Sequence, residues 1–134
     1  MLELENIAVD HGNVRALWDV SLTVREAECV GLLGANGAGK STAIGAVLGL
    51  YPIAGGRLVY AGADIAGRNP AENVAAGISL VPEGRRLFAE MTVEENLVMG
   101  AYARSARHRV TEGLARVYEL FSILKDKRLQ NVGE

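Results

Sequence analysis

The sequence is poor in cysteine and in aromatic residues, and it has no excess of charge of one sign. The single cysteine, Cys29, excludes an internal disulfide and gives no indication of an oxidising compartment. Aromatic residues make up only 5% of the chain, so the core must be built from aliphatic side chains. The formal net charge of −2 gives no electrostatic basis for binding nucleic acid, which requires a basic face.

The chain also has no pattern of a signal peptide and no long hydrophobic run. The first ten residues, "MLELENIAVD", contain no basic segment followed by an apolar one. No apolar run approaches the roughly 18 residues that a membrane-spanning helix requires. We therefore expect the chain to lie in the cytosol or on the cytosolic face of a membrane.

The first 34 residues contain two kinds of strand pattern, alternating at first and then continuously apolar. Residues 2–9 alternate apolar and polar side chains, and 14–24 resume this pattern after a turn at "DHGN". The run "CVGLLG" at 29–34 has no polar face, which predicts a strand covered on both sides, as in a parallel sheet. Small and aliphatic residues over 40–50 predict a helix. The order indicates antiparallel strands followed by a strand-loop-helix unit of the α/β kind.

Later elements are predicted from turn, cap and periodicity signals: a strand over 57–62, a helix over 69–77, a buried strand over 78–81, and helices over 92–103 and 110–124. Asn69 is the expected N-cap of the first of these helices, with a proline directly after it. Thr92 and Glu95 have the spacing of a capping box. In the last helix, Glu112 and Arg116 are expected to pair on the polar face.

The stretch "LLGANGAGKST" contains a phosphate-binding pattern, in which Gly34, Gly39, Lys40 and Ser41 satisfy the spacing GxxxxGK[ST]. Glycines permit left-handed backbone angles, so that successive N–H groups can point at one anion. The lysine supplies a charge for the β- and γ-phosphates, the serine hydroxyl a ligand for Mg²⁺, and Thr42 a possible bond to the α-phosphate. A strand before the loop and a helix after it support this interpretation over that of a glycine-rich turn that binds nothing.

Hydrolysis of the bound nucleotide requires further groups. A carboxylate at the end of a second buried strand must hold the Mg²⁺ shell, and another group must position the attacking water. The nearest candidate after the glycine loop is "ISLVPE" at 78–83, which Ser79 and Pro82 interrupt. The sequence therefore predicts binding of a nucleotide without the second half of the catalytic apparatus.

Two segments, 2–42 and "LVPEGRRLFAEMTVEENLVMGAY" at 80–102, resemble the ATP-binding subunits of ABC transporters. The second segment resembles the subunits of bacterial importers of branched-chain amino acids, in which a glutamate replaces the usual glutamine of the Q-loop. The resemblance implies an α/β fold, the front part of a P-loop NTPase (RecA-like) core with an antiparallel β subdomain. It divides the chain into an ATP-binding core over 1–84 and the start of a helical subdomain over 85–134.

The resemblance also implies roles for individual residues. His11 matches the aromatic position that stacks on adenine, usually a tyrosine, and Glu83 matches the Q-loop residue that senses Mg²⁺ and the attacking water. The implied metal ligands are Ser41 and Glu83. The alternatives are a turn histidine without ligand contact and an ordinary acidic loop residue. The residues implied to hold ATP are Gly34, Asn36, Gly37, Gly39, Lys40, Ser41, Thr42 and His11.

As function, the resemblance implies an energy-coupling subunit that binds ATP and Mg²⁺. Its implied partners are membrane permease subunits and a second ATP-binding subunit, which place it on the cytoplasmic face of the inner membrane. The chain is expected to be an N-terminal part that stops before the family's signature motif, inactive alone and prone to aggregate. The alternatives are a non-hydrolysing nucleotide-binding module, an ABC system with another solute, and a small P-loop kinase; the kinase is disfavoured because no lid arginine cluster is present.

Overall fold

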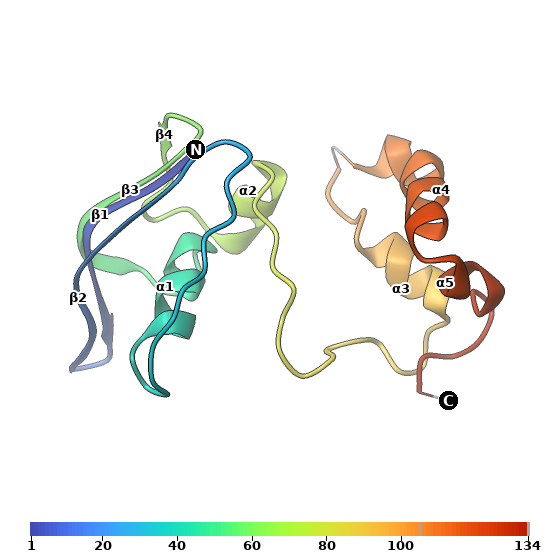
Figure 1. The fold of residues 1–134 in the computed structure, drawn as a ribbon, viewed down its shortest axis with the longest axis horizontal. Coiled ribbons are helices and arrows are strands. Elements are labelled where there is room, and N and C mark those ends of the chain that lie inside the picture. Colours follow the sequence, from blue (N-terminus) through green and yellow to red (C-terminus); the bar gives the residue numbers. More distant parts are fainter. Residues whose placement is uncertain (105, 134) are drawn as a thin grey trace. The chain divides into compact units, whose positions relative to one another are not determined.

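The computed structural model describes residues 1–104 and 106–133. The chain forms two compact units, Met1–Ser79 and Leu80–Glu134. The first unit holds an antiparallel sheet of four strands, β1 (Leu2–His11), β2 (Val14–Val24), β3 (Ile53–Tyr60) and β4 (Ala63–Asp64), in the order β2-β1-β3-β4. Two helices, α1 (Lys40–Val47) and α2 (Pro70–Ala75), complete it (Figure 1). The predicted hairpin over 2–24 is confirmed, because the alternating pattern gives each strand one face for the core.

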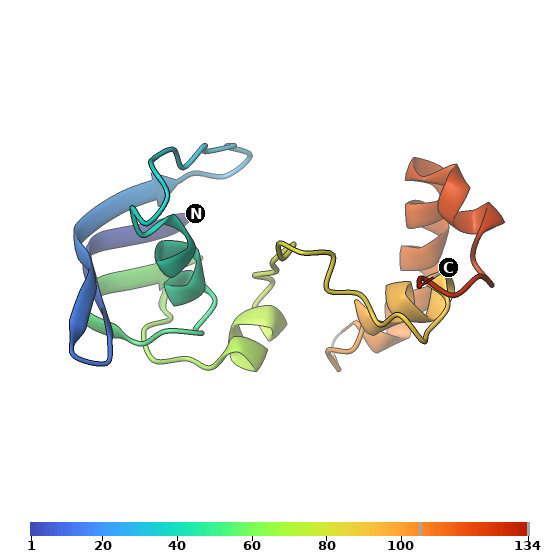
Figure 2. The same cartoon turned by 90° about the horizontal axis from the view of Figure 1, so that it is seen from below.

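Helix α1 lies against one face of the sheet, as Figure 2 shows for the first unit. The core between them is aliphatic, as the scarcity of aromatics predicts: Leu4, Ile7, Val9, Leu17, Ala43, Ala46, Leu58 and Ile65. Small residues on α1 bring its backbone close to the sheet. This packing fixes the start of α1 relative to β1 and β2.

Helix α2 begins as the sequence predicts. The Asn69 side chain accepts a hydrogen bond from Glu72 N, while the Glu72 carboxylate accepts one from Asn69 N, and a proline follows the N-cap. Within α2, the fully buried Asn73 donates from Nδ2 to the carbonyl oxygen of Val47 at 3.2 Å. That carbonyl belongs to the last turn of α1, where the helix leaves its acceptors unpaired. Asn73 therefore ties the two helices together.

Two predicted strands are wrong. Residues 29–34 and 78–81 form no strand, and both segments are largely exposed. The side chains of Leu33 and Val81 are 93% and 94% exposed. A strand covered on both faces forms only when neighbouring strands satisfy its backbone groups, and within residues 1–104 and 106–133 no segment pairs with either run.

The second unit contains α3 (Val93–Met99), a 3₁₀ turn η1 (Arg107–Arg109), α4 (Val110–Leu120) and α5 (Ser122–Asp126). The predicted capping box at the start of α3 is confirmed, because Thr92 Oγ1 accepts from Glu95 N while the Glu95 carboxylate accepts from Thr92 N. Tyr118 on α4 donates its hydroxyl to Glu94 Oε2 on α3 at 2.7 Å. Desolvation, and then this bond to Glu94, raises the pKa of the Tyr118 hydroxyl.

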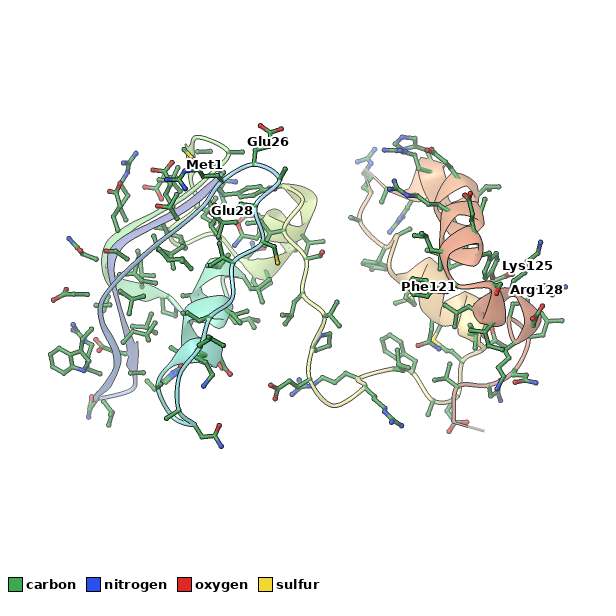
Figure 3. All side chains as sticks on the ribbon, in the orientation of Figure 1. Met1, Glu26, Glu28, Phe121, Lys125 and Arg128 are labelled. Atoms are coloured by element: carbon green, nitrogen blue, oxygen red, sulfur yellow. The ribbon has the colours of Figure 1, made fainter. Side chains whose placement is uncertain are left out.

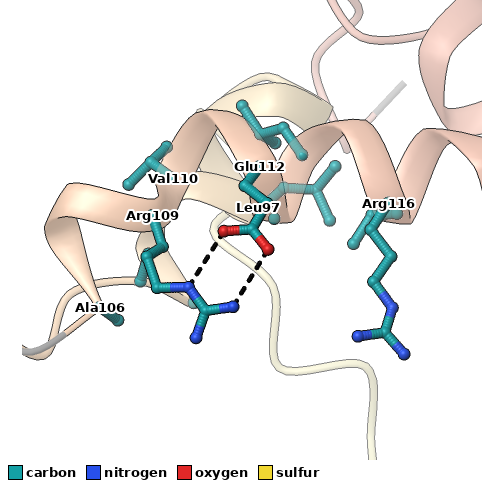
Figure 4. A pocket seen from close by; sticks show the side chains of 11 residues that line it. Leu97, Ala106, Arg109, Val110, Glu112 and Arg116 are labelled. Atoms are coloured by element: carbon teal, nitrogen blue, oxygen red, sulfur yellow. Dashed lines mark hydrogen bonds and ion pairs between the residues drawn. The ribbon is translucent and has the colours of Figure 1, made fainter.

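The helix predicted over 110–124 is interrupted at Phe121, whose backbone leaves the helical region (φ −132°, ψ 75°) between α4 and α5. Phe121 is 57% exposed, and Figure 3 shows it at the junction of the two helices. The predicted pair of Glu112 with Arg116 is wrong. Glu112 instead accepts two hydrogen bonds of 3.1 Å from Arg109, one turn earlier, whereas Arg116 stands apart (Figure 4).

Within the part of the chain that the structure describes, no helix has the length and apolar character needed to cross a membrane.

Candidate functional site

The glycine loop joins the exposed run 29–34 to the first turn of α1. Gly37 and Gly39 have φ angles of +83° and +87°, in the left-handed region that glycine adopts without strain. Between them, Ala38 N donates to the carbonyl oxygen of Ala35 at 3.2 Å and closes a turn that includes Asn36. Of the two glycines in the predicted pattern, Gly39 has the left-handed backbone and Gly34 does not.

Gly39 is the N-cap of α1, and no side chain caps the helix. The first turn of α1 also contains no acidic residue. The N–H groups at the start of a helix have no partner within it and carry the positive end of the helix dipole. This end of α1, beginning at Lys40, Ser41 and Thr42, is therefore suited to binding an anion.

Lys40 folds back over the loop. Its Nζ donates to the carbonyl oxygens of Gly34 and Ala35, both at 2.7 Å. A Cβ built on Gly34 would lie 3.3 Å from Ala38 Cβ and 4.0 Å from Lys40 Cδ, so the glycine keeps open the space inside the loop. These contacts hold the ammonium group over the loop, where it would meet the phosphate groups of a nucleotide.

His11, at the end of β1, contacts the start of α1 next to this loop. Its Nε2 lies 3.3 Å from Thr42 Oγ1, on the first turn of α1. Its ring also contacts Tyr51, edge to face, with ring centroids 4.6 Å apart and an interplanar angle of 83°. The structure therefore brings the predicted base contact next to the predicted phosphate contacts. Sequence reasoning missed Tyr51; the signal for it is a glycine in the middle of α1, where glycine is otherwise unfavourable.

Glu83 belongs to the other unit, on an exposed stretch without regular structure. Its role as a magnesium ligand together with Ser41 is therefore a prediction that the first unit does not test. Among the described residues, no group of three histidine, cysteine, aspartate or glutamate side chains is placed to hold a metal ion. Mg²⁺ does not require such a cage, because it is commonly held by one or two protein oxygens together with phosphates and water.

A hollow of about 480 Å³ lies in the other unit, between the end of α3 and α4 (Figure 4). Its lining is mostly apolar and includes Leu97, Val110 and Val117. The charges of Arg109 and Glu112 at its rim neutralise each other through their two hydrogen bonds, which lower the pKa of the Glu112 carboxyl. Arg116 also lines the hollow, and this one further guanidinium does not equal the set of donors that the start of α1 and Lys40 provide at the glycine loop.

Comparison with known proteins gives the family. The model of the ABC transporter family matches residues 17–132. The high-affinity branched-chain amino acid transport ATP-binding protein BraG of Pseudomonas aeruginosa is 38% identical over 133 residues, which are 99% of this chain and 57% of that relative. The xylose import ATP-binding protein XylG of Shigella flexneri is 31% identical over 98% of this chain and 25% of the relative. The chain thus spans little more than half the length of BraG.

Solved structures similar to this chain come from the same family. A nucleotide-free ATP-binding cassette from an ABC transporter is 28% identical, with a TM-score of 0.81 over 100% of this chain and 58% of that structure. The ATP-binding subunit of another ABC transporter is 29% identical, with a TM-score of 0.80 over 98% of this chain and 53% of its own. These neighbours confirm the predicted α/β fold of the P-loop NTPase class, and together with the match over 17–132 they show that the chain belongs to the ABC transporter family.

Proposed function

We propose that the chain binds ATP with Mg²⁺ through residues 34–42 and forms part of the energy-coupling subunit of an importer. The observation that carries this proposal is the geometry of the glycine loop. Two left-handed glycines lead into an uncapped helix start, and the Lys40 ammonium is held 2.7 Å from two carbonyl oxygens of the same loop. In the proposed complex, Lys40 exchanges these carbonyls for the β- and γ-phosphates.

The remaining contacts divide between the metal and the base. Ser41 is an exposed residue on the first turn of α1, where its hydroxyl would bind Mg²⁺ beside the phosphates, and Glu83 is the proposed Q-loop residue. His11 would stack on the adenine, since its ring is exposed and already bonded to Thr42. The ion supplies charge neutralisation of the phosphate oxygens when it is bound.

The solute of the proposed importer is a branched-chain amino acid. This is supported by the name of the P. aeruginosa relative and by the segment 80–102, in which Glu83 replaces the usual glutamine. The xylose relative favours a sugar as the second candidate, at lower identity. In either system, the proposed partners are permease subunits and a second ATP-binding subunit at the cytoplasmic face of the inner membrane.

Replacing Lys40 by alanine tests the proposal. Loss of a charged partner in a binding site costs about 2–5 kcal/mol, which predicts at least a 30-fold weaker affinity for ATP. The measurement is equilibrium binding of a fluorescent ATP analogue, with Mg²⁺, to submicromolar purified chain. Lys125→Ala is the matched control, because it removes the same charge from α5 in the other unit and should bind as the wild type does. Equal affinity of Lys40→Ala and wild type would refute the assignment of the phosphate loop.

A further inference from the structure

We propose that Tyr51 is a positioning residue that orients the His11 ring for the nucleobase, an inference that rests on the proposed binding of ATP. The two rings meet edge to face with centroids 4.6 Å apart and planes at 83°. Aromatic rings prefer this arrangement, because the positive edge of one ring meets the negative face of the other. The contact therefore favours one orientation of the imidazole over the others that an exposed histidine can adopt.

Tyr51 is itself held against α1. A Cβ built on Gly45 would lie 2.5 Å from Tyr51 Cε2 and 2.6 Å from Cδ2, so the tyrosine ring lies directly on the helix backbone. Glycine in a helix interior is unfavourable relative to alanine, and here its missing side chain makes room for the ring. Gly45 thus leaves the space that the Tyr51 ring occupies, and Tyr51 in turn contacts the His11 ring.

The imidazole is also anchored to α1 directly, through the 3.3 Å hydrogen bond between His11 Nε2 and Thr42 Oγ1. Both anchors, Gly45 through Tyr51 and Thr42 directly, belong to the helix whose N-terminus carries the phosphate site. A ring that is already oriented loses less freedom when a base stacks on it, and this strengthens binding. The arrangement holds the base-binding ring in a fixed place relative to the phosphates.

Tyr51 should therefore affect affinity for the base and leave affinity for the phosphates unchanged. The contacts that shape the phosphate loop are different ones: Lys40 with the Gly34 and Ala35 carbonyls, and the turn that Ala38 closes. Inorganic tripolyphosphate carries the phosphate chain without a base. Comparing it with ATP shows whether Tyr51 acts on the base or only on the folding of α1. A role in folding α1 would change the affinities for both ATP and tripolyphosphate.

The experiment measures the inhibition constants of ATP and of tripolyphosphate, each with Mg²⁺, against a fluorescent ATP analogue bound to the purified chain. Tyr51→Ala should weaken ATP about 5- to 20-fold, within the range of a lost base-stacking contact, and change tripolyphosphate less than about 2-fold. Tyr51→Phe keeps the ring and should restore wild-type affinity. Gly45→Ala displaces the ring, so it should also weaken ATP and change tripolyphosphate less than about 2-fold.

Equal weakening of ATP and tripolyphosphate in Tyr51→Ala would overturn the inference, because it would show a purely structural role. Unchanged ATP affinity in Tyr51→Ala would overturn it as well. Both results presuppose that the wild-type chain binds the two probes. A wild-type chain that binds neither probe refutes the proposed function itself, and a chain that binds both with equal strength refutes the role of His11 toward the base.

Discussion

Alanine in place of Gly39 should destabilise the first unit clearly more than alanine in place of Gly37. The two glycines have nearly the same left-handed backbone, with φ angles of +87° and +83°. They differ in their surroundings. A Cβ on Gly39 would lie 2.4 Å from Leu17 Cδ2 and 3.2 Å from the carbonyl oxygen of Ala16, whereas a Cβ on Gly37 would meet no atom within 4 Å.

The loss of unfolding free energy has two contributions, the left-handed backbone and the space around the new methyl group. Holding an alanine in the left-handed region costs about 1–2 kcal/mol at either position. At Gly39 the new methyl group also presses on Leu17, which is 4% exposed and packed in the core, and such overpacking costs about 1–3 kcal/mol more. We therefore expect a loss of about 2–5 kcal/mol for Gly39→Ala and about 1–2 kcal/mol for Gly37→Ala.

Urea denaturation followed by far-ultraviolet circular dichroism, without nucleotide, measures both free energies of unfolding. The slope with denaturant should stay constant, so that the midpoints report stability. Shortening Leu17 to alanine removes the clash, so Gly39→Ala should cost only the backbone contribution in the Leu17→Ala background. If Gly37→Ala is as damaging as Gly39→Ala, or if the Leu17→Ala background leaves the cost of Gly39→Ala unchanged, the packing argument is refuted.

Three further predictions concern the capping box at the start of α3, the pKa of Glu95 and the hydrolysis of ATP. Thr92→Ala removes the hydroxyl that accepts from Glu95 N and should cost about 1 kcal/mol of unfolding free energy in urea, whereas Thr92→Ser should not; equal losses would contradict the capping role. Hydrogen bonds from the Thr92 backbone and side chain lower the pKa of the Glu95 carboxyl below its ordinary 4.5. The ionised Glu95 carboxylate therefore stabilises the fold above pH 4.5, and this stabilisation is lost as the pH falls through the lower pKa of the folded state. The stability difference between wild type and Glu95→Gln should therefore shrink between pH 5 and pH 3, and a difference independent of pH would refute this linkage. Phosphate release by the purified chain with ATP and Mg²⁺ should not exceed background, because among the described residues no carboxylate follows a buried strand after residue 42. Measurable turnover by a homogeneous preparation would contradict this.

The sequence predicted best those features that depend on neighbouring residues. The N-cap at Asn69 and the capping box of Thr92 with Glu95 depend on residues at most three positions apart. The left-handed Gly39 of the phosphate loop likewise follows from a short spacing, and the hairpin over 2–24 follows from two alternating runs separated by a turn. In each case the groups that must meet are close in the chain, so local sequence is sufficient.

Features that depend on distant partners were predicted less well. The apolar runs 29–34 and 78–81 have the composition of buried strands, but a strand also requires a paired neighbour, which composition does not supply. The Glu112 pair was assigned by helical spacing, which permits a partner three or four residues away on either side, and Arg109 provides the closer geometry. The contact of Tyr51 with His11 joins positions 40 residues apart and has no spacing signal at all.

The phosphate loop keeps its form although residues 29–34 form no strand in front of it, and its contacts explain how. Gly39 packs on Leu17 and Ala16 of β2, and His11 of β1 bonds Thr42 on α1. The antiparallel sheet therefore supports the loop from its own side, independently of the strand that the apolar run predicted. Affinity for phosphates should accordingly depend on the packing of β1 and β2 against α1, and the Gly39→Ala variant should bind tripolyphosphate more weakly than Gly37→Ala.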